Sequence, residues 1–129
     1  MSDPVFIARA TVEMIHRRSL EQHGGQDGVR DDHALESALA QPVNVHLYGQ
    51  GDLCDLAAAY AFHLAQDQPF IDGNKRTAIA TALMFLEANS LPARRLTDEN
   101  LYDAMIAIAE RRLDKVAFAA IFRAALMRK

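Results

Sequence analysis

The feature that most restricts the fold is an apolar run from Ala78 to Leu86, which only Thr81 interrupts. It follows Gly73-Asn74, two residues that suit the start of a helix. A helix that is apolar on every side belongs at the centre of a fold, where other elements cover it. The sequence therefore predicts a buried central helix that begins near Gly73-Asn74.

Apolar residues elsewhere are also spaced as in amphipathic helices, so we expect an all-α fold. A first helix should end near Gly24, because glycine accepts the left-handed conformation of a helix C-terminus. Pro42 should lie just past the end of a second helix, and a third helix must stop before Pro69. Residues expected to face inward are Val5, Ala8, Val12 and Ile15; Leu35 and Leu39; Leu53, Leu56, Ala57, Tyr60, Ala61 and Leu64; Leu101, Ala104, Met105 and Ile108; and Phe118, Ile121, Phe122 and Ala125.

The expected helix caps are Asp31 or Asp32, Thr97 and Asp114. Between the first two helices lies the polar stretch 25–32, whose turn formers predict a short extended flap or hairpin. No strand-like alternation competes with the helical pattern. We therefore expect one domain over residues 1–129, a bundle of about six helices around the central one, with a short flap.

Composition excludes several classes of function. The net charge of −3 offers no global attraction to nucleic acid, and the few pairs of adjacent arginines are typical of solvated helix ends. The N-terminus has no basic region followed by an apolar stretch, so no signal peptide is expected. No window approaches about 20 uninterrupted apolar residues, so no membrane span is expected. The sequence thus predicts a cytoplasmic protein with no direct nucleic-acid or membrane partner.

Residues 72–76, Asp-Gly-Asn-Lys-Arg, are the candidate chemical site at the start of the central helix. Free backbone N–H groups and the positive end of the helix dipole suit a phosphate there. Gly73 lets the backbone approach a ligand closely, and Lys75 and Arg76 add charges that suit phosphate oxygens. Asp72 offers an oxygen ligand to a Mg²⁺ ion that bridges to a nucleotide.

The alternative is an ordinary turn and helix cap, with Lys75 and Arg76 facing water. Cations are unfavourable at a helix N-terminus unless an anion lies there, which favours a ligand. A Walker P-loop is excluded, since it needs G-x-x-x-x-G-K-S/T after a strand and a helix is expected before Gly73.

The stretch from Gln68 to Arg76, Gln-Pro-Phe-Ile-Asp-Gly-Asn-Lys-Arg, closely resembles the Fic/Doc signature H-P-F-x-D/E-G-N-G/K-R. Lys75, where many Fic proteins have glycine, resembles the Doc branch, the death-on-curing toxins. The upstream pattern is also similar to Doc-type proteins: Gly24-Gly25, Gly28-Val29-Arg30-Asp31, Leu35-Glu36-Ser37-Ala38-Leu39 and Pro42. The resemblance covers nearly the whole chain.

This resemblance implies a chemistry. Fic proteins transfer the AMP moiety of ATP to a target hydroxyl, whereas Doc-type toxins phosphorylate a threonine of elongation factor Tu and stop translation. Lys75 indicates the second outcome, because a side chain there crowds a phosphate site that glycine leaves open. The implied roles are Asp72 for Mg²⁺; Gly73, Asn74, Lys75 and Arg76 for the phosphates of ATP; Phe70 as the anchor of the loop; and Gly28, Val29, Arg30 and Asp31 as the flap that aligns the target peptide.

The departure from the family is at the catalytic position, where Gln68 replaces histidine. The histidine acts as a general base, and glutamine has no pKa near neutrality with which to replace it. His63, five residues earlier, and His16, His23, His33 and His46 receive no role from the motif. Gln68 fits either a deliberately disarmed toxin or a natural protein that lost catalysis.

Three functions therefore remain open: a Doc-like toxin without its base, a Doc-fold pseudoenzyme that only binds nucleotide or antitoxin, and a Fic-type AMP transferase. Many Fic proteins inhibit themselves through a glutamate with serine or threonine four residues before it, and no glutamate here has that pattern. Inhibition within the chain is therefore not expected, and the resemblance to Doc-type toxins implies a separate antitoxin, with a disordered segment that folds on binding.

Overall fold

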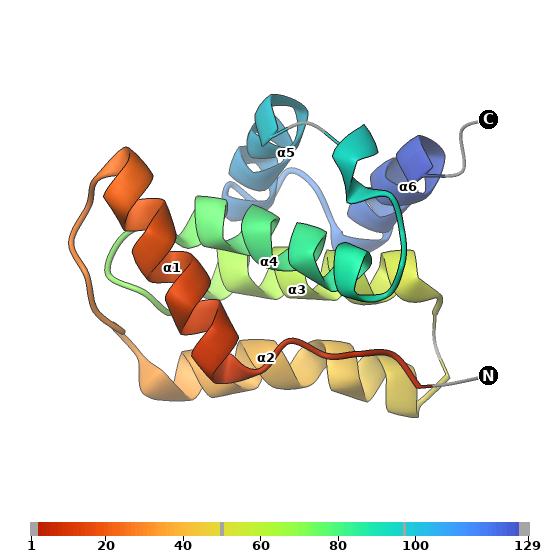
Figure 1. Ribbon diagram of the computed structural model, residues 1–129, viewed down its shortest axis with the longest axis horizontal. Helices are drawn as coiled ribbons and strands as arrows, with labels where there is room; N and C mark the ends of the chain where they lie inside the picture. The colour runs from red at the N-terminus through yellow and green to blue at the C-terminus, as the bar shows by residue number, and fades with distance from the viewer. Residues whose placement is uncertain (1–2, 50, 97, 127–129) are drawn as a thin grey trace.

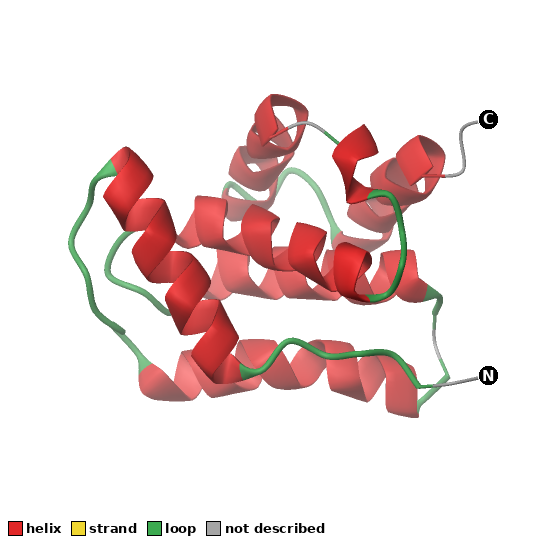
Figure 2. Cartoon of the chain, in the orientation of Figure 1, coloured by secondary structure: helices red, strands yellow, loops and turns green. Residues whose placement is uncertain are grey.

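The computed structural model describes residues 3–49, 51–96 and 98–126, and all the regular structure in this part is helical (Figure 2). The described elements are α1 (Arg9–His23), α2 (Asp32–Leu47), α3 (Leu53–Asp67), α4 (Asn74–Ala88), the short 3-10 helix η1 (Ala93–Arg95), α5 (Asp98–Ala109) and α6 (Lys115–Leu126). The predicted all-α bundle of about six helices is confirmed. None of the helices within the described residues is both long and apolar enough to cross a membrane.

Two helices share the centre of the bundle. α3 contacts α2, α4, α5 and α6, while α4 contacts α1, α3, α5 and η1 (Figure 1). The start of α4 at Asn74 agrees with the sequence, and its face toward α3 is buried. The opposite face of α4 is only partly buried: Ala80, Leu83 and Met84 are half-buried beside α1. The central position is therefore divided between α3 and α4.

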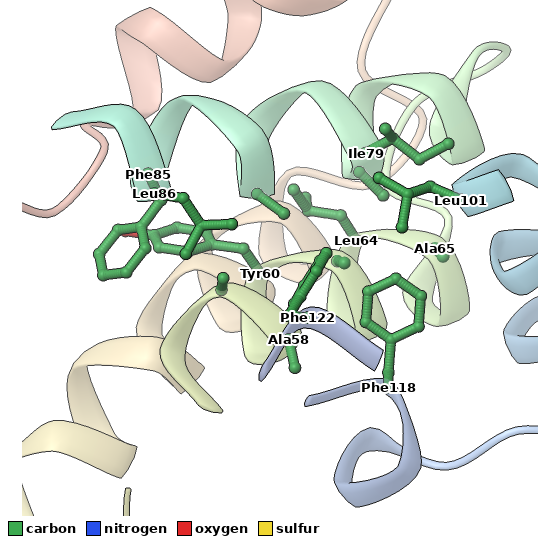
Figure 3. Close-up of a cluster of buried hydrophobic side chains, with 14 of the residues drawn as sticks. Ala58, Tyr60, Leu64, Ala65, Ile79, Phe85, Leu86, Leu101, Phe118 and Phe122 are labelled. Carbon is green, nitrogen blue, oxygen red and sulfur yellow. The ribbon is translucent and has the colours of Figure 1, made fainter. Parts of the chain in front are cut away.

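The core between α3, α4 and α6 is built from aromatic rings and alanines (Figure 3). Tyr60 packs against Phe85 with ring centroids 5.3 Å apart, and its hydroxyl accepts a hydrogen bond from the Ile7 N–H (2.9 Å). Phe118 and Phe122 of α6 meet edge to face at 4.6 Å. Small residues along α3 let the neighbouring helices approach closely, which fixes the end of α3 relative to the start of α4.

Pro42 lies inside α2 and not beyond its end, so that prediction is wrong. A proline there removes one helical hydrogen bond and normally breaks a helix. Pro42 is buried together with Leu35 and Ala38 on the inward face of α2. Packing of this face against α3 offsets the missing bond, and α2 continues to Leu47.

Three inward-facing assignments are also wrong, all of them at or near the edges of helices. Val5 is 55% exposed and precedes α1, because its backbone N–H and C=O are both held by the side chain of Asn89 (2.8 and 3.0 Å). Ala8, the N-cap of α1, is exposed as well. Ile121 is 40% exposed, since the buried face of α6 runs through Phe118, Ala119, Phe122 and Leu126 and turns Ile121 to one side.

The predicted caps at Asp31 and Asp114 are confirmed, since their carboxylates accept hydrogen bonds from the Ala34 and Ala117 N–H groups (3.0 and 2.8 Å). Thr97, the predicted cap of α5, lies outside the described residues. Each confirmed cap satisfies one of the N–H groups that a helix start otherwise leaves open.

His63 gives the fold a specific acid sensitivity. Burial, and then the charge of Lys115 with its Nζ 3.2 Å from Nε2, lower the pKa of His63 from 6.5 to about 4. Between these values the unfolded chain binds a proton that the folded chain does not, so stability falls as pH drops through this window. The unfolding free energy should fall between neutral pH and about pH 5 in both proteins. We expect this fall to be smaller in His63→Gln than in the unaltered chain by roughly 1 kcal/mol, after allowance for solvent screening. Urea denaturation at both pH values measures this, and an unchanged difference would contradict it.

Candidate active site

The motif loop leaves α3 through a left-handed residue. Gln68 is exposed and has φ 48° and ψ 58°, because the following Pro69 disfavours right-handed helical geometry at the preceding position. The side chain of Arg30 caps this end of α3: its Nε and Nη2 donate to the Gln68 carbonyl (2.9 and 2.5 Å), and Nη2 also donates to the Asp67 carbonyl (3.1 Å). A cation at a helix C-terminus is favourable. Arg30 thus fixes the backbone of the position that carries the family histidine.

Asn74 locks the turn between Pro69 and α4. Its Oδ1 accepts from the Phe70 N–H (2.9 Å) and its Nδ2 donates to the Phe70 carbonyl (3.0 Å). Phe70 is buried in the core at 1% exposure, and its role as the anchor of the loop stays a prediction. Both polar atoms of the Asn74 side chain are therefore hydrogen-bonded within the loop. Only its backbone N–H, at the start of α4, is left for a ligand. A contact of Asn74 with phosphate stays a prediction.

The start of α4 has no side-chain cap. Gly73 occupies the N-cap position with φ 79°, a conformation that glycine adopts without strain. A side chain there would also meet neighbours, since an added Cβ would lie 3.3 Å from Leu20 Cδ2. The first N–H groups of α4, at Asn74, Lys75 and Arg76, are consequently not satisfied by a capping side chain.

Lys75 and Arg76 are both half-buried in the first turn of α4. Among the described residues neither forms an ion pair with a carboxylate. The Arg76 guanidinium instead lies over the ring of Tyr102 in α5, 4.6 Å from its centroid, with Nη1 3.4 Å from Nε2 of His23. Two cations at the positive end of a helix, without an anionic partner, make this a centre of positive potential.

The flap is docked on the motif loop by backbone bonds. Val29 and Phe70 form an isolated antiparallel bridge, Arg30 N–H donates to the Pro69 carbonyl (2.8 Å), and Ile71 N–H donates to the Gly28 carbonyl (3.0 Å). Gly28 has φ 132°, and an added Cβ would lie 2.9 Å from the side chain of Ile71. Both segments lie at the same end of the bundle in Figure 1. The predicted flap therefore exists as one extended strip paired with the loop.

Asp72 is exposed, and one carboxylate oxygen, Oδ2, accepts from the Gln26 N–H of the flap (2.8 Å). Among the described residues no group of three or more metal-ligating side chains occurs. A single accessible carboxylate fits Mg²⁺ in nucleotide sites, where one or two carboxylates and the substrate phosphates are the usual ligands. The donor set is therefore suited to a nucleotide-borne Mg²⁺ ion.

His16 and His23, to which the sequence assigned no role, both lie at this site. His16 Nε2 is 2.7 Å from the Asp72 carbonyl, and His23 contacts Arg76 as described above. The two histidines are seven residues apart on α1, so they share one face of that helix. This spacing is the one signal in the sequence that links them. His63, by contrast, is engaged with Lys115 of α6.

A groove of about 360 Å³ continues from Arg76 between α1 and α4. Its apolar floor consists of Ile15, Ile79, Ala80, Leu83 and Met84. Its polar rim consists of Arg18, Ser19, Gln22, His23, Arg76 and Glu87. The half-buried face of α4 is thus the floor of this groove.

A bundle with paired central helices, an uncapped glycine start of α4 and a flap paired to the motif loop is consistent with the Fic/Doc fold. The chain belongs to this family: a sequence model described as Fic/DOC family matches residues 6–86. The chain is similar to Toxin Doc of Mycolicibacterium smegmatis, with 38% identity over 101 residues that cover 75% of this chain and 77% of the relative. It is also similar to Protein kinase doc of Escherichia phage P1, with 31% identity over 78 residues, 60% of this chain and 62% of the relative.

Proposed function

We propose that this chain is the toxin of a toxin–antitoxin pair whose family activity is transfer of the γ-phosphate of ATP to a protein hydroxyl. A threonine of elongation factor Tu is the target that the Doc resemblance implies, with arrest of translation as the result. The observation that carries the proposal is the pair of cations at the uncapped start of α4, Lys75 and Arg76, neither of which has a carboxylate partner among the described residues. An anion stabilises such a charge arrangement, and polyphosphate is the anion that the family uses.

Each residue of the loop then has a physical task. The N–H groups of Asn74, Lys75 and Arg76 and the two cationic side chains hold the phosphates, as charge-assisted bonds do. Asp72 would hold Mg²⁺, which supplies charge neutralisation of the transferring phosphoryl group. The flap from Gly28 to Asp31 holds the target segment beside position 68.

Gln68 limits the reaction. Its amide can accept a hydrogen bond from the target hydroxyl and orient it, but it cannot remove the proton. Loss of a general base typically lowers a rate by about 10²–10⁴. We infer that this chain retains nucleotide binding while it transfers phosphate very slowly or not at all.

The same substitution favours a second candidate, a Doc-fold pseudoenzyme that binds nucleotide or its antitoxin without chemistry. The antitoxin acts in trans in either case. The groove between α1 and α4 supports a partner of this kind, because its apolar floor and charged rim suit an amphipathic segment that folds on binding. An AMP transferase is disfavoured by Lys75, because its side chain crowds a phosphate site that glycine leaves open.

Nucleotide binding tests the proposal without catalysis. We expect calorimetry of the chain with ATP and Mg²⁺ to detect binding that Arg76→Ala weakens by about tenfold or more, the range expected for hydrogen bonds to charged groups. Arg94→Ala is the matched control, since Arg94 is exposed on η1, beyond the opposite end of α4. Equal affinity of the Arg76→Ala and Arg94→Ala proteins would indicate that this helix start is only a turn and cap.

A further inference from the structure

His16 is a buried residue to which neither the motif nor the proposed chemistry gives a task. Its side chain is 2% exposed, and its ring stacks on Phe70 with centroids 3.9 Å apart and planes 10° apart. His16 belongs to α1, whereas Phe70 belongs to the loop between α3 and α4. The stack therefore joins the motif loop to a helix far from it in the sequence.

The hydrogen bond of His16 defines its tautomer. Nε2 lies 2.7 Å from the carbonyl oxygen of Asp72, and a carbonyl oxygen only accepts, so Nε2 carries a proton. The other nitrogen, Nδ1, lies 3.8 Å from a carboxylate oxygen of Asp27 in the flap.

This bond holds the peptide that precedes the helix start. The Asp72 carbonyl belongs to the same peptide unit as the N–H of Gly73, the left-handed N-cap of α4. The ring also packs against Gly73, since a Cβ added there would lie 3.6 Å from Cδ2 of His16. Rotation of this peptide would move the Asp72 carboxylate on one side and the first N–H groups of α4 on the other.

We propose that His16 is a positioning residue of the phosphate site: its Nε2–H fixes the Asp72–Gly73 peptide, and thereby the metal-binding carboxylate and the anion-binding N–H groups. The inference rests on the proposed function of this loop. His16 is not a substitute for the missing base, because its ring is buried beneath Phe70 and its Nε2 proton is engaged with Asp72. A catalytic base must reach the hydroxyl that it deprotonates.

The unaltered chain supplies the first test. Nitrogen-15 NMR of the side chains is expected to show neutral His16 as the Nε2–H tautomer, with that proton slow to exchange. A proton on Nδ1 in the neutral ring would overturn the proposal, because the bond to Asp72 would then be absent. This measurement needs no ligand, so it stands apart from the question of ATP binding.

Two variants then separate the hydrogen bond from the packing. His16→Phe keeps an aromatic ring on Phe70 and removes the donor, whereas His16→Gln keeps an N–H of similar reach and removes the ring. We expect His16→Phe to shift the Gly73 and Asn74 amide resonances and to weaken ATP binding about three- to tenfold, as expected for one lost hydrogen bond. His16→Gln should restore the Gly73 and Asn74 amide resonances to near their original positions and restore most of the affinity for ATP. His33→Phe, at an exposed site on α2, is the control.

The outcomes distinguish the two proposals. Lower thermal stability in His16→Phe with unchanged amide resonances and an unchanged dissociation constant for ATP would show a purely structural residue. Failure of the unaltered chain to bind ATP would refute the proposed function, while the tautomer and the Gly73 resonance would still decide whether His16 positions the loop. If His16→Phe does not fold, the tautomer of His16 and the His16→Gln variant provide the test. Loss of ATP binding in a folded His16→Gln protein would then contradict the positioning role of the His16 hydrogen bond.

Discussion

Replacing Gln68 with histidine is expected to convert this chain into a protein that arrests bacterial growth when its expression is induced. Every other motif position from Pro69 to Arg76 fits the family, and the loop is already locked by Asn74. The substitution restores the one group able to accept the proton of a target hydroxyl. We expect phosphoryl transfer to rise by about 10²–10⁴.

The backbone favours this outcome. Position 68 is left-handed, and histidine is one of the residue types enriched in that conformation. The bonds from Arg30 go to the Gln68 carbonyl, so they do not depend on its side chain. Gln68→Asn is the matched control, because asparagine also accepts this conformation but is no base. Growth arrest by both variants, or by neither although both are folded and bind ATP, would contradict the assignment of position 68.

The second large effect concerns which part of ATP is transferred. In the Gln68→His background, the chain with Lys75 should place a phosphoryl group on its target, and Lys75→Gly should shift the product toward an adenylyl group or abolish activity. The lysine head group adds bulk and charge where a phosphate must turn. Mass spectrometry of the modified target measures this directly, since the two adducts differ greatly in mass.

A matched variant separates bulk from charge at position 75. Lys75→Met keeps a side chain of similar length and removes the charge. If bulk alone selects the orientation of ATP, Lys75→Met retains phosphoryl transfer at a reduced rate. An adenylyl adduct formed while Lys75 is present would show that the assignment to the Doc branch is wrong.

Periodicity predicted most of the fold because it reports which face of a helix is buried. It located the buried stripe of α3, while Gly73-Asn74 and Gly24 located the start of α4 and the end of α1. The proline rule failed at Pro42, where packing of α2 outweighed a broken hydrogen bond, and periodicity failed at Val5, whose backbone is held by a distant asparagine. In both cases a tertiary contact overruled a local preference.

In the candidate site, too, local sequence signals located some residues and tertiary contacts determine the roles of others. The linear motif contained Gln68, Asp72, Lys75 and Arg76, which a single loop and helix start present together. The residues that hold this loop in place come from other elements: His16 from α1 and Tyr102 from α5. Arg30 was predicted only as part of the flap, but its side chain caps α3. Such roles depend on spatial neighbours, and sequence spacing reports only neighbours on the same helix.

We propose above all that the start of α4 is an ATP phosphate site for γ-phosphoryl transfer that lacks only its base. The direct measurement incubates purified protein with ATP labelled at the γ-phosphate and with purified elongation factor Tu, and then counts label on the protein target. We predict label with Gln68→His, almost none with the unaltered chain, and almost none when Asp72→Asn is added to Gln68→His. Equal label with and without the histidine, or no label from a folded Gln68→His protein that binds ATP, would contradict the claim.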